Sequence, residues 1–160
     1  CGTGSTAIAH APYVKHMRAI DFSTKMIAIA QSKADTNNVL NITFEQSTID
    51  SISASDQTYD AVLGLSILHL LEDKDAVIAK VYKMLKPGGL FVTSTTCLGD
   101  TMKVLGLIAP LGKALGLMPL VKVFTTQELE ESLTDAGFET DYQWQPDKGK
   151  AVFIVAKKVA

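Results

Sequence analysis

The chain opens on Cys1-Gly2-Thr3-Gly4, and this stretch decides how the rest of the sequence is interpreted. Glycines at alternate positions let the backbone turn tightly and let a ligand approach the main chain where a Cβ atom would clash. The turn runs into a helix-like segment, Ser5 to Ala11. An apolar run, Met17 to Ile20, then leads to Asp21, 17 residues after Gly4. A glycine turn, a helix, a strand and an acidic residue about 20 residues on form the pattern with which a parallel α/β sheet holds an adenosine ligand.

A glycine loop of this kind needs a strand that enters it. The chain instead starts inside the loop and has no initiator Met. We therefore expect an N-terminally truncated chain whose first strand is missing. An unfilled position in the sheet would leave unpaired backbone groups at a strand edge.

Length and composition favour one domain, residues 1–160, with a sizeable core. Apolar residues make up 47% of the chain, which argues against disorder. The net charge of −2 comes from 15 basic and 17 acidic residues that are spread evenly, so a nucleic-acid surface is not expected. Cys1 and Cys97 lie far apart without metal-type spacing, so we expect neither a disulfide scaffold nor a metal site, and a cytoplasmic location.

The most apolar segment, Val104 to Val123, does not read as a membrane span. It is interrupted by Lys113 and Lys122, by Pro110 and Pro119 and by glycines. Its uncharged runs therefore fall short of the roughly 18 apolar residues that a spanning helix needs. The interrupted segment therefore gives no reason to expect membrane association.

Helical and strand patterns alternate along the chain, which predicts a parallel sheet with right-handed crossovers. The expected strands are His16–Ile20, Asn41–Glu45, Tyr59–Leu65 and Leu90–Thr96. The expected helices are Ser5–Ala11, Thr24–Lys33 behind the N-cap Ser23, Asp73–Leu85, and one that the Thr125/Glu128 capping box opens and Gly137 closes. Two last strands, Phe138–Gln145 and Lys150–Lys157, flank a turn and predict an antiparallel hairpin.

Two of these segments carry more specific expectations. Tyr59 to Leu65 has the near-continuous apolar character of a strand that is buried on both faces. Lys86-Pro87-Gly88-Gly89 should end the helix before it, because proline removes a backbone donor and glycine permits unusual backbone angles.

The chain resembles the class I S-adenosylmethionine-dependent methyltransferases, particularly their small-molecule branch, in five ordered segments. These are Cys1-Gly2-Thr3-Gly4, Ala19-Ile20-Asp21-Phe22-Ser23, Thr58-Tyr59-Asp60-Ala61-Val62, Leu68-His69-Leu70-Leu71 and Leu85-Lys86-Pro87-Gly88-Gly89. Any one segment is a weak signal, but the ordered set is strong, and the likeness extends over essentially the whole chain up to the terminal strand Phe153 to Lys158. The resemblance implies a Rossmann-like three-layer α/β/α sandwich, with a mostly parallel sheet, an antiparallel C-terminal hairpin and, here, a missing first strand.

The resemblance also implies where S-adenosylmethionine would bind. The glycine loop would pack against the methionine part, Asp21 would bind the ribose, and Phe22 and Met26 would sandwich the adenine. The position beside the adenine amino group, often Asp in the family, falls on Thr48, which carries no charge. The implied cofactor-binding residues are Cys1, Gly2, Thr3, Gly4, Asp21, Phe22, Met26, Thr48, Ile49 and, through their backbone, Leu65 and Ser66.

The activity that the resemblance implies is methyl transfer to a small, hydrophobic or aromatic organic acceptor. The sulfonium of the donor is already activated, so the protein mainly holds acceptor and methyl group in line, and catalytic residues stay unassigned. His69 is a candidate base, with a structural role as the alternative. Thr95, Thr96 and Cys97, at the end of a strand, either line the acceptor site or simply terminate the strand.

The helical pattern changes between Gly99 and Phe124, where short, apolar, glycine-punctuated helices are expected. We interpret residues 99–124 as an apolar helical cap insertion that covers the active site, selects the acceptor and excludes water. A pair of packing helices or a homodimer contact is the alternative interpretation.

Two other functions stay open. Residues 2 to 7 also fit the Gly-x-Gly-x-x-Gly/Ala fingerprint of a nicotinamide-dependent oxidoreductase, although the terminal hairpin and the Leu-Lys-Pro-Gly-Gly segment argue against that class. The other candidate is a degenerate, non-catalytic binding fragment whose exposed sheet edge pairs with another chain. Of the possible partners, we expect a small-molecule methyl acceptor, not nucleic acid or a membrane.

Overall fold

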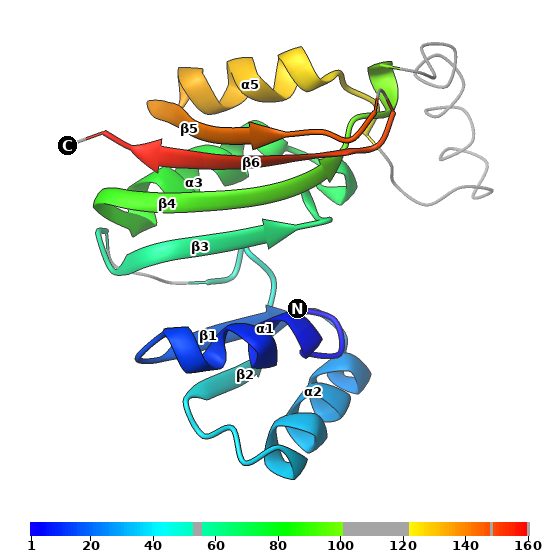
Figure 1. Ribbon diagram of the computed structural model, residues 1–160, viewed down its shortest axis with the longest axis vertical. Helices are drawn as coiled ribbons and strands as arrows, with labels where there is room; N and C mark the ends of the chain where they lie inside the picture. The colour runs from blue at the N-terminus through cyan, green and yellow to red at the C-terminus, as the bar shows by residue number, and fades with distance from the viewer. Residues whose placement is uncertain (53–55, 101–121, 148, 160) are drawn as a thin grey trace. The chain divides into compact units, whose positions relative to one another are not determined.

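A computed structural model describes residues 1–52, 56–100, 122–147 and 149–159 (Figure 1). The chain divides into two compact units, Cys1–Ser53 and Ala54–Ala160. The expectation of a single domain stays a prediction.

The first unit is a parallel strand pair covered by two helices. β1 (Met17–Asp21) pairs with β2 (Ile42–Gln46), and the crossover between them runs through α2 (Thr24–Thr36). Before β1 lies α1 (Ser5–His10), which continues into the 3-10 turn η1 (Ala11–Tyr13). The order helix, strand, helix, strand agrees with the predicted parallel crossover.

Small residues form the core of the first unit. Ala7 and Ala11 pack against Ala19 of β1 and Ile42 of β2. The predicted N-cap of α2 is confirmed, because the Met26 N–H donates to the Ser23 hydroxyl at 3.4 Å. The predicted end of α2 at Lys33 is too early: the helix runs to Thr36, since Ala34 is still buried one turn after the buried Ala30.

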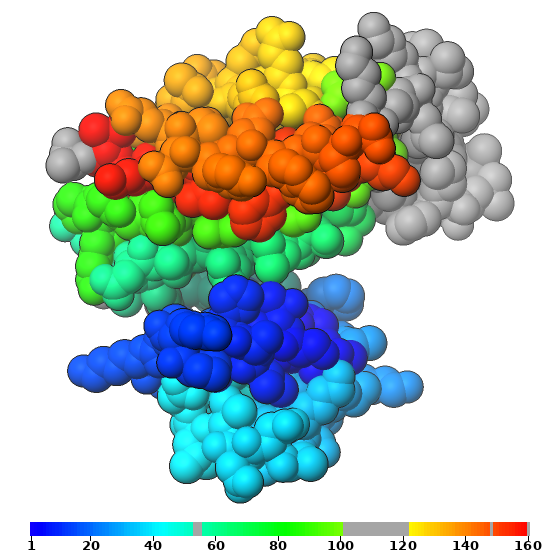
Figure 2. Space-filling model, in the orientation of Figure 1, coloured from blue at the N-terminus to red at the C-terminus, as the bar shows by residue number. Residues whose placement is uncertain are grey.

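The second unit contains a four-stranded sheet in the order β3-β4-β6-β5. β3 (Tyr59–Leu65) and β4 (Leu85–Thr96) are parallel, and α3 (Lys74–Met84) connects them. β6 (Ala151–Lys158) pairs antiparallel with both β4 and β5 (Phe138–Trp144), which confirms the predicted hairpin. Figure 2 shows this hairpin, in orange and red, beneath the yellow α5.

Three shorter elements complete the second unit: η2 (Leu68–Leu70), η3 (Leu98–Asp100) and α5 (Thr126–Asp135). The capping box that opens α5 is confirmed, because the Glu128 N–H donates to the Thr125 hydroxyl at 3.1 Å and the Thr125 N–H donates to the Glu128 carboxylate at 2.6 Å. Most of the predicted cap, residues 101–121, lies outside the described residues.

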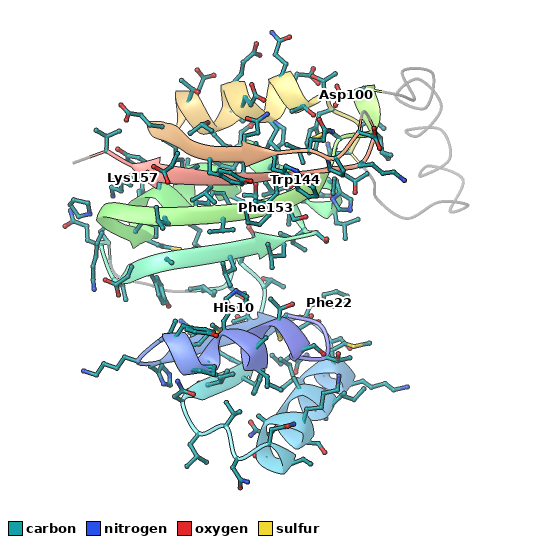
Figure 3. The ribbon with its side chains drawn as sticks, viewed as in Figure 1. His10, Phe22, Asp100, Trp144, Phe153 and Lys157 are labelled. Carbon is teal, nitrogen blue, oxygen red and sulfur yellow. The ribbon has the colours of Figure 1, made fainter. Side chains whose placement is uncertain are left out.

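α3 and α5 pack together on one face of the second sheet. Tyr82 of α3 meets Phe138 edge to face, with the ring centroids 5.0 Å apart, and Lys74 of α3 donates to Ser132 of α5 at 2.6 Å. The buried side chains of this face are Phe91, Thr93 and Thr95 of β4 and Val152, Ile154 and Ala156 of β6. On the opposite face, Trp144 and Phe153 lie on paired positions of the hairpin, and Trp144 is 55% exposed (Figure 3).

Two strand predictions are wrong in part. β4 begins at Leu85 and not at Leu90. Tyr59 pairs with Leu85 and Ala61 pairs with Leu90, so Lys86 to Gly89 form an irregular stretch within the strand. β3 was predicted to be buried on both faces, yet among its residues only Gly64 is buried. In the four-stranded sheet β3 is the edge strand, so it has a neighbouring strand on one side only.

Parallel pairs joined by helices and a terminal antiparallel hairpin agree with the expected Rossmann-like α/β class. The three-layer arrangement involves both units together and stays a prediction, as does the missing first strand.

Lys158 stabilises the junction between α3 and β4. Only 9% of this residue is exposed, and its ammonium donates to the carbonyls of Tyr82 at 2.7 Å and Leu85 at 2.9 Å. The same ammonium lies 4.5 Å from the centroid of the Tyr82 ring. It therefore satisfies carbonyl groups at the end of α3 that lack a partner within the helix.

Lys158→Met keeps the apolar stem and removes the charged donor. We expect the free energy of unfolding to fall by about 2 kcal/mol, because two inward-facing carbonyls lose a charged hydrogen-bond donor and a cation–π contact is lost. Urea denaturation measures this change. Lys157→Met, at the exposed neighbouring position, is the matched control and should change stability by less than about 0.5 kcal/mol. Equal effects of the two substitutions would contradict this role of Lys158.

Candidate functional site

Asp21, at the carboxyl end of β1, connects the glycine loop to the turn before α2. Its Oδ2 accepts a hydrogen bond from the Gly2 N–H at 2.8 Å, and the terminal ammonium of Cys1 lies 3.0 Å from the same oxygen. Its Oδ1 accepts from the Ser23 N–H at 3.0 Å. One carboxylate therefore fixes the conformation of two loops that meet at this strand end.

The surroundings of Asp21 favour its ionised form. Burial raises the pKa of this carboxyl group, but the backbone hydrogen bonds from Ser23 and Gly2 and the nearby terminal ammonium outweigh that effect, so its pKa lies below the usual value. The group is consequently an anion at neutral pH. Among the described residues its Oδ1 accepts only from the Ser23 N–H and so retains capacity to accept a further hydrogen bond, for example from a ribose hydroxyl.

The two glycines of the loop serve different purposes. Gly4 has φ 75°, and a Cβ added there would lie 2.7 Å from the Cβ of Ala30 and 3.2 Å from the Phe44 ring, so it is required for packing. Gly2 has φ 56°, and a Cβ added there would meet nothing within 4 Å. Gly2 therefore leaves open space at the backbone, as the approach of a ligand requires.

Lys33 of α2 holds the other side of the loop. Its ammonium donates to the hydroxyls of Thr3 at 3.0 Å and Ser5 at 3.1 Å. The sequence pattern does not single out this residue, because a lysine in the last turns of a helix is usually just a solvated charge near the helix C-terminus. Its loop-binding role depends on how closely α2 approaches the loop.

Phe22, directly after Asp21, presents its ring to solvent and is 75% exposed (Figure 3). Its carbonyl accepts a hydrogen bond from the Gln46 side chain at 3.2 Å, which fixes the backbone at the ends of β1 and β2. Met26 is half-buried in the first turn of α2. An open aromatic face beside an anionic carboxylate suits a nucleoside, whose base can stack while its ribose donates hydrogen bonds.

Thr48 and Ile49 follow the end of β2. The Ser47 N–H donates to the Asp21 carbonyl at 3.0 Å, so this segment stays beside the end of β1. The Thr48 hydroxyl lies 2.9 Å from that of Ser51, and Thr48 is exposed whereas Ile49 is half-buried. The expected cofactor residues between Cys1 and Ile49 therefore all belong to the first unit, around the carboxyl ends of its two strands.

Leu65 and Ser66, in the second unit, end β3. Ser66 has φ 56°, a left-handed conformation that costs a residue other than glycine about 1 kcal/mol. Its N–H donates to the Ser94 carbonyl at 2.7 Å. The backbone thus leaves the sheet abruptly at the carboxyl end of β3, which is where ligands bind in open α/β sheets.

His69 follows in η2 and is half-buried. Burial lowers its pKa, so the imidazole is neutral at pH 7. Its Nδ1 is buried without a hydrogen-bond partner among the residues that the structure describes, and its carbonyl accepts from the Lys122 N–H at 2.8 Å. A neutral imidazole at this sheet edge is compatible with a base and with a structural residue.

The three residues expected at the end of β4 do not share one environment. Thr95 and Cys97 are fully buried on the face that the helices cover, and burial raises the pKa of the Cys97 thiol to about 11. These two side chains therefore do not line an open site. Thr96 points to the opposite face and is half-buried.

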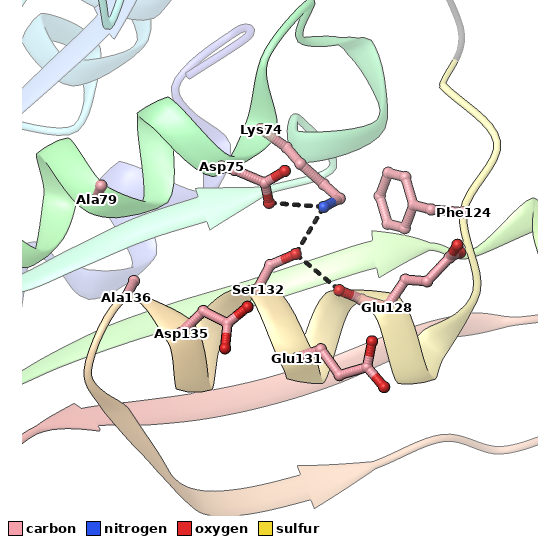
Figure 4. A pocket seen from close by; sticks show the side chains of 9 residues that line it. All are labelled: Lys74, Asp75, Ala79, Phe124, Glu128, Glu131, Ser132, Asp135 and Ala136. Atoms are coloured by element: carbon pink, nitrogen blue, oxygen red, sulfur yellow. Dashed lines mark hydrogen bonds and ion pairs between the residues drawn. The ribbon is translucent and has the colours of Figure 1, made fainter.

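A groove of about 560 Å³ lies between α3 and α5 (Figure 4). Lys74 crosses it, with its ammonium 2.7 Å from Asp75 and 2.6 Å from the Ser132 hydroxyl.

Within the described residues there is no group of three His, Cys, Asp or Glu side chains that could hold a metal. Nor is any helix in the described ranges long and apolar enough to cross a membrane.

Comparison with known proteins gives methyltransferases among the relatives of this chain. The family described as "methyltransferase domain" matches residues 1–89. A ubiquinone biosynthesis O-methyltransferase of Rickettsia akari is 31% identical over 144 residues, which cover 87% of this chain and 56% of that protein. The uncharacterized methyltransferase YcgJ of Bacillus subtilis is 31% identical over 91 residues, 57% of this chain and 36% of that protein. The chain thus spans about half or less of the length of these relatives.

Solved structures confirm the expected fold class. The crystal structure of YcgJ superposes with a TM-score of 0.80 at 18% identity and covers 99% of this chain and 89% of that one. The [4+2]-cyclase SpnF superposes with a TM-score of 0.83 at 17% identity and covers 100% of this chain and 72% of that one. Both likenesses concern the Rossmann-like fold alone.

Asp21→Asn leaves one acceptor oxygen where the carboxylate offers two. Either the Gly2 or the Ser23 amide loses its acceptor, so the free energy of unfolding should fall by about 1–3 kcal/mol at neutral pH. The folded pKa of Asp21 lies below the unfolded value of about 3.9, so its contribution is present above that pH and is lost as the pH falls through the folded pKa. Urea denaturation of both proteins over this range should show their stabilities converging in acid. A constant difference would contradict the prediction.

Substitution of the loop glycines should separate packing from ligand approach. Gly4→Ala should lower the free energy of unfolding by about 2 kcal/mol or more, because the new Cβ overlaps Ala30. Gly2→Ala should cost only about 1 kcal/mol of strain, yet weaken S-adenosylhomocysteine binding at least about tenfold. Gly88→Ala, at φ 76° and in open space, is the control for strain alone. Binding to Gly2→Ala that matches binding to Gly88→Ala would rule out ligand approach at Gly2.

Proposed function

Because the chain belongs to the methyltransferase-domain family, the class I S-adenosylmethionine-dependent methyltransferases, we propose that it transfers a methyl group from S-adenosylmethionine to a small, hydrophobic or aromatic organic acceptor. The observation that carries this proposal is the ionised Asp21 between the open backbone of Gly2 and the exposed ring of Phe22. This combination suits a nucleoside with a further group that extends along the glycine loop.

The residues of the first unit would bind and orient the cofactor. Asp21 would accept hydrogen bonds from the ribose hydroxyls, Phe22 and Met26 would contact the adenine, and the Gly2 backbone would allow the methionine part to approach. Bound S-adenosylmethionine supplies an activated methyl group on a sulfonium, so the demand on the protein is alignment more than acid–base chemistry. In the second unit the backbone of Leu65 and Ser66 would hold the amino group of the methionine part.

The acceptor side of the proposal rests first on His69. His69 is neutral and partly exposed at the carboxyl end of β3, so it can accept a proton from an acceptor that must lose one. The Rickettsia relative is named for a methyl transfer in ubiquinone biosynthesis, and this supports a small organic acceptor here. The apolar segment 99–124 supports a hydrophobic or aromatic one. A cytoplasmic location and a homodimer stay predictions.

Nicotinamide-dependent hydride transfer is less well supported. Tyr82 and Lys86 have the Tyr-x-x-x-Lys spacing of one oxidoreductase class, but Tyr82 packs on Phe138 and Lys86 pairs with Asp60 at 2.7 Å. Both residues lie near the amino ends of β3 and β4, away from the strand ends at which α/β sheets bind ligands.

The test is transfer of a labelled methyl group from S-adenosylmethionine to a panel of phenolic, carboxylic and amine acceptors. We expect one equivalent of S-adenosylhomocysteine per methylated product for at least one acceptor class. Asp21→Ala should abolish transfer, whereas Gly88→Ala, near the amino end of β4 and away from its carboxyl end, should retain it. Cofactor binding by the folded protein without transfer to any acceptor would instead favour the non-catalytic alternative.

A further inference from the structure

The turn that follows β2 carries three hydroxyl side chains beside the proposed nucleoside site. The Ser47 N–H donates to the Asp21 carbonyl at 3.0 Å, and Gln46 donates to the Phe22 carbonyl at 3.2 Å. The turn is therefore tied directly to the residues proposed to bind the ribose and the base. We refer to Ser47, Thr48 and Ser51 as the hydroxyl turn.

The hydroxyl turn satisfies its own hydrogen bonds. The Thr48 hydroxyl lies 2.9 Å from the Ser51 hydroxyl, which in turn lies 3.1 Å from that of Ser47. The backbone joins in reciprocally, because the Ser51 N–H donates to the Thr48 hydroxyl at 3.3 Å and the Thr48 N–H donates to the Ser51 hydroxyl at 3.1 Å. The three side chains thus need no ligand to complete their pairing.

A neutral, self-paired hydroxyl discriminates between ligands differently from a carboxylate. A carboxylate only accepts hydrogen bonds, so a site built around it is left unpaired when the ligand lacks the matching N–H. A hydroxyl can donate or accept, and the one on Thr48 is exposed and already paired. A ligand without an N–H at that point would leave nothing unsatisfied.

We propose that the hydroxyl turn, and not a carboxylate, faces the purine of the cofactor. The exocyclic amino group of adenine therefore adds little to the affinity for the cofactor. The inference rests on the proposed function, since it concerns how S-adenosylmethionine and its product bind. It makes Thr48 the residue that sets tolerance at the 6-position of the purine.

Asp50 is the carboxylate that could carry this role instead. It is exposed and lies in the same turn, two residues after Thr48. A direct contact between its carboxylate and the amino group would give strong preference for adenine. The experiment therefore includes this residue.

Calorimetric titration with S-adenosylhomocysteine and with its 6-desamino analogue, in which purine riboside replaces adenosine, tests the inference. The wild type should bind both within about fivefold of each other, because no acceptor is left unpaired. Thr48→Asp supplies an acceptor and preserves the turn, since an aspartate can also accept from the Ser51 N–H. Its preference for S-adenosylhomocysteine should rise by about tenfold or more relative to the wild type. Thr48→Ser, the matched control, should keep the wild-type ratio.

A wild-type preference above about fivefold would overturn the inference, since a dedicated acceptor would then bind the amino group. Loss of such a preference in Asp50→Asn would identify that acceptor as Asp50. If the folded wild type binds neither compound, the proposed function falls and the inference falls with it. Normal binding of S-adenosylhomocysteine with strong rejection of the analogue overturns the inference alone.

Discussion

The hydrogen bonds that the Asp21 carboxylate accepts from Gly2 and Ser23 are the constraint on which the candidate site depends. They fix the glycine loop before α1 and the turn before α2 against the same strand end. The carboxylate that we propose to bind the ribose is thus also the group that shapes the loop beside it. Under that proposal, a change at this residue is expected to affect both ligand binding and local folding.

Much of the local structure could be predicted from short-range signals. The N-cap Ser23, the capping box at Thr125 and the C-terminal hairpin depend on neighbouring residues, and all three are confirmed. The start of β4 was missed because Pro87 and the glycines after it are typical of a helix end, whereas here they lie within a strand. The burial of Thr95 and the roles of Lys33 and Lys158 depend on partners 28 or more residues away, which local patterns do not contain.

The sequence predicts the positions of some candidate cofactor residues well and those of others poorly. The glycine loop, Asp21 and Phe22 have a fixed order and spacing, and the structure brings them together at one strand end. Thr48 was assigned from the family resemblance, whereas its pairing with Ser51 is visible only in the structure. The fold alone does not decide the chemistry, because the same architecture also occurs in a [4+2]-cyclase.

The most direct test of the account is a calorimetric titration of the wild-type chain with S-adenosylhomocysteine and, in parallel, with NADH. If the ionised Asp21 and the open Gly2 form a nucleoside site of the methyltransferase kind, S-adenosylhomocysteine should bind with micromolar affinity and NADH should not bind. Binding of NADH in preference to S-adenosylhomocysteine, or of neither ligand to the folded protein, would contradict it.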